Sequence, residues 1–412
     1  YMVVMVFAVF FIMSFVTNIL GPIVPDIISS FDLSLTAAAF LPFSFFIAYG
    51  VLSIPAGFLV ELWGEKKVVV ISFAISFVGS LIFALMPVYE VAIGSLFLIG
   101  GSMAALQVAL NPLLRTAGGE ENFAFYSAFA QLVFGSASFV SPQIYTYIIR
   151  NIGTPDGNKN LIIDALDRVV PAKLPWISMY WIFTALLFVM ILFLGATRFP
   201  KVIRAREEEA GTVGMYRQLL RNPAVILFFI SVFFYVGSEQ GTANWISEFL
   251  HKYYGYDPHT TGAMVVAYFW GLFTVGCFVG MLLLKFFDSR IVLRAFAALA
   301  LVSLTASLFG PGPVAKIAFP CIGLFASVMW PIIISLALNS VLEYHGPLAG
   351  ILCSGIMGGA VLPLVIGRIG DISSLRVGMC ILYLSFGWVL CVSFWAKPLV
   401  VNKTIFTGQT AQ

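Results

Sequence analysis

The sequence predicts an all-α membrane protein of 12 transmembrane helices, arranged as two six-helix bundles. Residues 1–396 hold twelve apolar runs, and roughly 20 apolar residues suffice for a helix to cross a bilayer. Hydrophobic residues make up 60% of the chain and charged residues only 10%, whereas a soluble domain carries about 25% charged residues. A charged stretch at 197–222 separates the sixth run from the seventh, which divides the chain into two halves.

Hydropathy places the spans in order along the chain, and they leave only short loops between them. We therefore expect no separate soluble domain. The spans of the first half are expected at about 2–30, 36–60, 68–87, 90–114, 123–149 and 176–196. Those of the second half are expected at about 224–252, 259–284, 291–310, 314–341, 349–369 and 377–396.

The charged linker sets the expected domain boundaries and orientation. With the linker in the cytoplasm, 14 of the 22 Lys and Arg residues lie on that side and 8 on the other. Cytoplasmic loops carry the excess of basic residues, so both termini are expected inside the cell. The net charge of +3 is too small to suggest nucleic-acid binding. The expected units are 1–196 as the N-terminal bundle, 197–222 as a cytoplasmic linker, 223–396 as the C-terminal bundle and 397–412 as a cytoplasmic tail.

The two halves repeat a pattern after their second spans. Gly57 is followed by a charged loop that ends at Lys66 and Lys67, and Gly280 by one that ends at Arg290, with about ten residues between glycine and last basic residue in each half. Glycine allows close helix packing in membranes. Two repeated six-span halves around a midplane site are the architecture of the major facilitator superfamily.

One carboxylate, Glu239, falls near the middle of the expected seventh span. A carboxylate at that depth costs about 2.5–3.5 kcal/mol on insertion scales, so it indicates a functional site. Tyr235 and Thr242 share its helix face, and the amides Gln240 and Asn244 share the adjacent face. The alternative is a structural hydrogen-bond cluster between helices.

Further amides and tryptophans are expected at similar depth. In span four, Gln107 and Asn111 form a stripe with Arg115, which either joins that stripe or anchors the helix end at the headgroups. Side-chain amides both donate and accept hydrogen bonds, which suits a hydroxyl-rich solute. Mid-span tryptophans either pack in the core or stack on the apolar face of a sugar. The candidate substrate-binding residues are Asn18, Gln107, Asn111, Gln131, Gln240, Asn244, Trp270 and Trp330.

Several classes of protein lack support in the sequence. We find no P-loop, no nucleophile elbow or HExxH motif and no metal-ligand cluster, so we expect neither an ATP-driven pump nor an enzyme. The five cysteines lie inside expected spans without a CxxC motif, and we interpret them as small buried hydrophobes. The first apolar run continues to about residue 30 without a small-residue cleavage site, so no cleavable signal peptide is expected.

Several stretches together match the pattern of a known family. They are 54–57 (IPAG), 106–112 (LQVALNP), 130–131 (AQ), 235–239 (YVGSE), 330–331 (WP), 335–336 (SL) and 356–360 (IMGGA), with Pro363, Gly367 and Asp371. By these stretches the chain resembles the fucose–galactose–glucose:proton symporter branch of the major facilitator superfamily over essentially its whole length. Gly21 and Gln107 stand where the fucose-transporting members carry carboxylates, and the glutamine is usual in the glucose/galactose members. The resemblance implies an inner-membrane sugar importer driven by a cation gradient.

These observations together predict a secondary active transporter that imports a hexose or deoxyhexose by alternating access. Glu239 is the expected coupling group, either taking up a proton when buried or binding sodium; no other cofactor or metal is expected. The alternatives are a sugar uniporter without coupling, an exporter of another small polar or amphipathic solute, or a membrane receptor that only binds its ligand. We expect a monomer in a bacterial inner membrane, with a small-molecule sugar and the lipid bilayer as its partners.

Overall fold

The computed structural model describes residues 2–118, 123–153, 160–197, 199, 213–341 and 344–396. Every regular element in these ranges is a helix, and twelve helical segments are long and apolar enough to span a membrane. The predicted fold class is confirmed. Most of the expected linker 197–222 and all of the expected tail 397–412 lie outside the described residues.

The first half contains α1 (Met2–Thr17) and α2 (Leu20–Phe31), which form one span, then α3 (Leu35–Trp63), α4 (Glu65–Leu85), α5 (Tyr89–Gly118), α6 (Phe123–Asn151), the short α7 (Leu161–Val169) and η2 (Pro175–Ile177) leading into α8 (Ser178–Ala196). A short helix, α9 (Val213–Leu219), follows. The second half contains α10 (Pro223–Ala243), α11 (Ile246–Tyr254), η4 (Pro258–Gly262), α12 (Ala263–Phe286), α13 (Ser289–Phe309), α14 (Gly312–Ala326), α15 (Met329–Ser340), α16 (His345–Ser354), η5 (Gly355–Met357), α17 (Gly358–Ile372), α18 (Leu375–Met379) and α19 (Ile381–Trp395).

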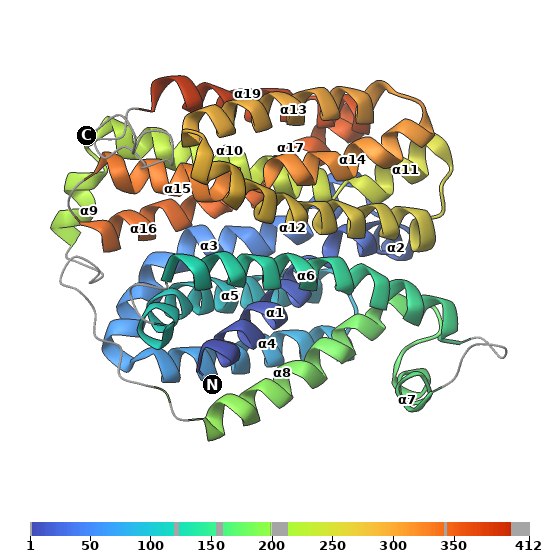
Figure 1. Ribbon diagram of the computed structural model, residues 1–412. Coiled ribbons are helices and arrows are strands. Elements are labelled where there is room, and N and C mark those ends of the chain that lie inside the picture. Colours follow the sequence, from blue (N-terminus) through green and yellow to red (C-terminus); the bar gives the residue numbers. More distant parts are fainter. Residues whose placement is uncertain are drawn as a thin grey trace, which may run out of the picture.

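The helices form two bundles that lie side by side, with both ends of the described chain at the same end of the molecule (Figure 1). We call that end, which holds Met2 and Trp395, the terminal face. The opposite end, which holds α7 and the connections 32–34 and 255–257, is the distal face. The positive-inside excess makes the terminal face the expected cytoplasmic side.

Local capping residues fix several helix ends. The Ser34 hydroxyl accepts a hydrogen bond from the Ala37 backbone N–H and begins α3, and Asn222 accepts from Ala224 at the start of α10. These are preferred N-cap residues, because their short side chains satisfy N–H groups that have no partner inside the helix. Before α3, Asp32 adopts a left-handed backbone conformation (φ 50°) that ends α2 and turns the chain.

Three spans are interrupted by a two-residue turn near their middle or distal third. Span one breaks at Asn18–Ile19, span seven at Asn244–Trp245 and span ten at Ser327–Val328. Proline explains two of the breaks, because Pro22 and Pro331 lack the N–H that would bond to the carbonyl oxygens of Asn18 and Ser327. The seventh span, expected as one helix over 224–252, is instead divided into the two helices α10 and α11.

The stretch 150–175, expected to be only a polar connection, contains the nine-residue helix α7. Asn160 caps it by accepting from the N–H groups of Ile162 and Ile163. Its inner face buries Ile163 and Leu166, while Leu161 is 86% exposed. The apolar residues at helical spacing were too few to stand out from the surrounding charges.

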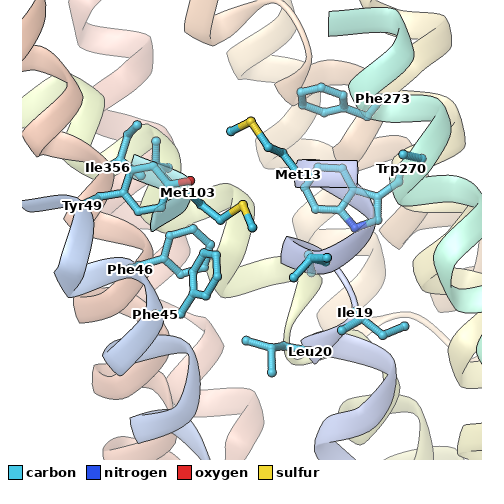
Figure 2. Packing of buried hydrophobic residues seen from close by; sticks show 14 of the residues in the cluster. Met13, Ile19, Leu20, Phe45, Phe46, Tyr49, Met103, Trp270, Phe273 and Ile356 are labelled. Atoms are coloured by element: carbon cyan, nitrogen blue, oxygen red, sulfur yellow. The ribbon is translucent and has the colours of Figure 1, made fainter. Parts of the chain in front are cut away.

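The apolar core continues across the boundary between the halves. Figure 2 shows Phe45, Phe46 and Tyr49 of α3 facing the region beside Met103 and Ile356. On the other side of the same view, Met13 of α1 lies beside the indole of Trp270 and near Phe273 of α12. The two halves therefore meet through side chains from α1, α3 and α12.

Glycines set the distance between the halves where helices cross. A methyl group at Gly271 of α12 would lie 2.8 Å from the Phe139 ring of α6, and one at Gly367 of α17 would lie 2.6 Å from the Leu35 carbonyl oxygen of α3. Gly280, singled out by its repeated spacing, lies against Val328. Glycine at these points permits the close approach that packing in a membrane requires.

Candidate functional site

Glu239 lies one turn before the end of α10, and donors from the same helix occupy both of its carboxylate oxygens. The Tyr235 hydroxyl donates to Oε2 at 2.5 Å, and the Gln240 Nε2 donates to Oε1 at 3.1 Å. Tyr235 and Glu239 are four residues apart, so they lie one above the other on the helix. The carboxylate is thus held in place by its neighbours on the same helix.

The surroundings of Glu239 place it toward the interior of the second half. The ring of Tyr235 lies 6.2 Å from that of Trp330 on α15. The thiol of Cys277 on α12 is close enough to Glu239 for an electrostatic interaction and donates to the Ser327 carbonyl oxygen at 3.7 Å. Glu239 is half-buried. It therefore lies where α10, α12 and the α14–α15 break converge.

Gln240 connects this cluster to the boundary between the halves. A methyl group at Gly359 of α17 would lie 3.1 Å from the ring of Phe46 and 3.2 Å from Cγ of Gln240. Phe46 belongs to α3 of the first half. Gln240 is therefore placed beside both α17 and α3, and its amide lies between the carboxylate and the first half.

The two candidate residues Asn18 and Asn244 each begin a helix break at the same position in their half. The breaks lie against each other, because a methyl group at Gly21 would lie 2.5 Å from the Ala243 carbonyl oxygen and 3.4 Å from Cα of Asn244. Nδ2 of Asn18 donates to the Ser138 hydroxyl of α6 at 2.8 Å. Within the described part of the chain, Oδ1 of Asn18 and Nδ2 of Asn244 are buried without a hydrogen-bond partner.

A buried amide group without a hydrogen-bond partner costs free energy. A hydroxylated ligand at this junction could donate to Oδ1 of Asn18 and accept from Nδ2 of Asn244, which would remove that cost. The sequence prediction missed the serines that support this junction. Ser14 and Ser138 hydroxyls lie 2.6 Å apart, and the Ser141 hydroxyl donates to the Phe15 carbonyl oxygen at 3.0 Å. Serines at small spacings in α6 were the available signal.

The remaining candidates are not all joined to this cluster. Gln107 on α5 and Gln131 on α6 are half-buried, as is Trp330. Trp270 is only 1% exposed and packs edge-on against Phe269 and Phe273; its Nε1 has no partner among the described residues. The side chains of Asn111 and Arg115 lie outside the described residues.

The distal face carries a second group of ionisable residues that the sequence prediction did not connect. Asp26 of α2 accepts a hydrogen bond from the Tyr145 hydroxyl of α6, and Nε2 of His259 in η4 lies 3.2 Å from its other oxygen. Asp371, at the end of α17, accepts from the backbone N–H groups of Leu35 and Thr36, each at 2.8 Å. Both contacts join one half to the other.

Two aspartates in loops have pKa values below their usual range. Burial alone would raise the pKa of Asp257, but hydrogen bonds from the Thr260 hydroxyl and the His259 backbone N–H outweigh it. The Arg290 side chain and backbone likewise outweigh burial and lower the pKa of Asp288. Both carboxylates are therefore ionised at neutral pH. In the described ranges, no three His, Cys, Asp or Glu side chains gather closely enough to hold a metal ion.

Comparison with known proteins gives consistent results. A model of the Major Facilitator Superfamily matches residues 6–352. A glucose/galactose transporter of Brucella abortus biovar 1 (strain 9-941) is 29% identical over 391 residues, which cover 92% of this chain and 90% of that protein. The L-fucose-proton symporter of Escherichia coli (strain K12) is 24% identical, over 88% of this chain and 85% of that protein.

Solved structures share the fold. The crystal structure of the E. coli fucose:proton symporter superposes with a TM-score of 0.69 at 20% identity, over 96% of this chain and 98% of that chain. A bacterial homologue of the lysosomal transporter Spinster, in an inward-facing occupied conformation, superposes with a TM-score of 0.71 at 13% identity, over 96% of both chains.

Proposed function

Since this multi-pass membrane protein belongs to the major facilitator superfamily, a family of transporters and not of enzymes, we propose that it imports a monosaccharide by cation-coupled symport. The observation that carries the proposal is the Glu239 carboxylate, held between Tyr235 and Gln240 inside the second half. Ionisable groups within membrane spans mark ion and substrate pathways. The glucose/galactose and fucose transporters among its relatives support a sugar as the solute.

The polar groups near the two helix breaks support a hydroxyl-rich substrate. Oδ1 of Asn18 offers an acceptor and Nδ2 of Asn244 a donor, and one sugar hydroxyl can satisfy both kinds of group. The half-buried Trp330 lies beside Tyr235, the donor to Glu239, and its indole offers an apolar face for the sugar ring. Gln107, Asn111 and Gln131 complete the proposed set from the first half.

Transport proceeds in this proposal by rocking the two halves about the central site, so that each membrane face gains access in turn. Glu239 is the coupling group. Its transfer between a solvated and a buried environment changes its preference for the charged form, which links substrate movement to a proton; sodium at the same carboxylate is the second coupling ion to test. The protein acts as a monomer, in a bacterial inner membrane with the terminal face in the cytoplasm.

The proposal is tested in proteoliposomes after the substrate has been found by a panel of monosaccharides, since a ligand that binds the native state raises its melting temperature. Glu239→Gln keeps the size of the side chain and one of its two acceptor oxygens but removes its charge. We expect this variant to lose accumulation driven by a proton or sodium gradient and to retain exchange of labelled for unlabelled sugar.

Glu90→Gln is the matched control, because Glu90 is an exposed carboxylate in the first turn of α5. It should accumulate sugar like the unsubstituted protein. Imposing a proton gradient and a sodium gradient separately identifies the coupling ion. Undiminished uphill uptake by Glu239→Gln would refute the coupling role, and the absence of any sugar that is bound or exchanged would refute the substrate class.

A further inference from the structure

A groove with a volume of about 890 Å³ lies between α6 of the first half and α12 and α14 of the second. Phe139 and Val140 form one wall, and Met264, Tyr268 and Ile317 form the other. Met264 and Tyr268 are each 48% exposed and Ile317 is 69% exposed, so the groove opens outward, away from the core. None of the proposed sugar-binding residues lines it.

The groove has one polar end. Thr260 and Thr261 of η4 and Lys316, one turn into α14, line it there. Because η4 leads into α12 and α14 begins at Gly312, this end lies at the distal face. The Lys316 ammonium sits 4.8 Å from the centre of the Tyr256 ring, which holds it beside the mouth. Within the ranges that the structure describes, Lys316 makes no ion pair.

An outward-facing apolar channel with an unpaired cation at its membrane-surface end matches the chemistry of an amphiphile with an anionic head. Hydrocarbon chains gain by covering apolar surface, and a basic residue at the membrane surface attracts anionic lipid headgroups. A free sugar offers neither a chain for the walls nor a charge for Lys316.

We propose that this groove binds an anionic phospholipid from the leaflet at the distal face. Its phosphate lies at Lys316 and the Thr261 hydroxyl, since the Thr260 hydroxyl already donates to the Asp257 carboxylate. Its acyl chains follow the walls formed by α6, α12 and α14. The site is independent of the sugar site and of the coupling role of Glu239.

The floor of the groove is the contact between the halves. Gly271 of α12 lies against the Phe139 ring of α6, and Gly135 of α6 lies against the Thr274 side chain of α12. A lipid seated there touches both halves at once, so it stabilises their present arrangement relative to any arrangement in which α6 and α12 move apart.

The test measures the melting temperature of the purified protein in detergent micelles as phosphatidylglycerol or phosphatidylcholine with the same acyl chains is added. We expect phosphatidylglycerol to raise it at lower concentration, and inorganic phosphate alone to leave it unchanged. Lys316→Gln should weaken the preference for phosphatidylglycerol by about fivefold, the effect of one basic residue at an anionic membrane surface. Lys173→Gln, at an exposed position outside the groove, should keep the full preference.

A second pair of variants tests the apolar part. Val275→Trp fills the groove, which Val275 lines at 50% exposure, whereas Val302→Trp adds the same bulk at a 65% exposed position on α13. We expect Val275→Trp to lose the response to both lipids and Val302→Trp to retain it. Equal responses to the two lipids, or an unchanged preference in Lys316→Gln, would overturn the proposal, as would a Val275→Trp variant that responds like Val302→Trp. Each comparison is made within one variant, so a change in its basal stability does not affect it.

Discussion

The imidazole of His259 lies 3.2 Å from the carboxylate of Asp26, and the two residues belong to different halves of the protein. Asp26 is at the distal end of the first span, and His259 is in the short π-helical segment before α12. The Tyr145 hydroxyl holds the second oxygen of Asp26. Together with the hydrogen bonds from the start of α3 to Asp371 of α17, these residues connect the halves at the distal face.

Breaking the Asp26–His259 pair should favour separation of the halves at the distal face. The pair is partly exposed, with side chains 14% and 34% accessible, so its contribution is of the order of an exposed ion pair, up to about 1 kcal/mol. Asp26→Asn should therefore lower the ratio of closed to open molecules by up to about fivefold. Distances between spin labels at positions 29 and 372, in a background without the native cysteines, report this ratio. His259→Gln should act in the same direction. An unchanged distance distribution in both variants would contradict the role of the pair.

Asp371→Ala should loosen the same face by a separate route. Its carboxylate accepts from the first two N–H groups of α3, where a negative charge also complements the helix dipole. Loss of such a cap costs about 0.5–2 kcal/mol. The same spin labels should show a larger open fraction. The double variant with Asp26→Asn should show the sum of the two free-energy changes. A double variant no more open than either single variant would mean that the two contacts do not act independently.

The positions of the spans follow from local properties of the sequence. A run such as the one expected at 36–60 is recognised by its length and lack of charge, and the structure has it as Leu35–Trp63. The ends shift by a few residues because caps decide them: Ser34 begins α3, and Gly64, with φ 80°, follows its last residue. The placement of Tyr235 beside Glu239 on one helix face also followed from helical spacing.

The contacts between the halves could not be predicted in this way. Asp371 and Thr36 are 335 positions apart, and nothing local to either residue indicates the other. The break at Asn244 is similar, because no proline marks it. Nε1 of Trp245 donates to the Pro363 carbonyl oxygen of α17 at 3.3 Å, so tertiary packing supports a break that the apolar pattern conceals.

Gly21→Ala should prevent the two helix breaks from meeting. The added methyl group would lie 2.5 Å from the Ala243 carbonyl oxygen, and overpacking of a buried contact typically costs about 1–3 kcal/mol. We expect a lower melting temperature, a larger distal-open fraction and slower uptake. Gly94→Ala is the control, because its methyl group would meet no atom within 4 Å; a Gly21→Ala protein that matches this control in all three measurements would show that the breaks need not touch.

Tyr235→Phe should impair transport without unfolding the protein. The substitution keeps the ring that packs near Trp330 but leaves Oε2 of Glu239 without its donor. A hydrogen bond to a charged group contributes about 1.5–3 kcal/mol, so gradient-driven uptake should fall by at least about tenfold. Tyr383→Phe removes a hydroxyl that, among the described residues, bonds to the Thr305 side chain 2.8 Å away, and this variant should transport normally. Equal uptake by the two variants would contradict the positioning of Glu239 by Tyr235.

Asp288 should stabilise the terminal face in a pH-dependent manner. Its carboxylate caps α13 through the Arg290 N–H at 2.8 Å and pairs with the Arg290 side chain at 3.1 Å, which together lower its pKa below the usual 3.8. A carboxylate with a lowered pKa contributes stability above its unfolded-state pKa and loses it as the pH falls through the folded-state value. At neutral pH, Asp288→Ala should therefore cost about 1 kcal/mol, and the difference in melting temperature from the unsubstituted protein should shrink below about pH 4. Asp288→Asn keeps a capping oxygen but not the charge, so it should recover only a minor part of the loss at neutral pH and show no such pH dependence. A difference between Asp288→Ala and the unsubstituted protein that persists at low pH would show that the ionised form is not what stabilises the helix end.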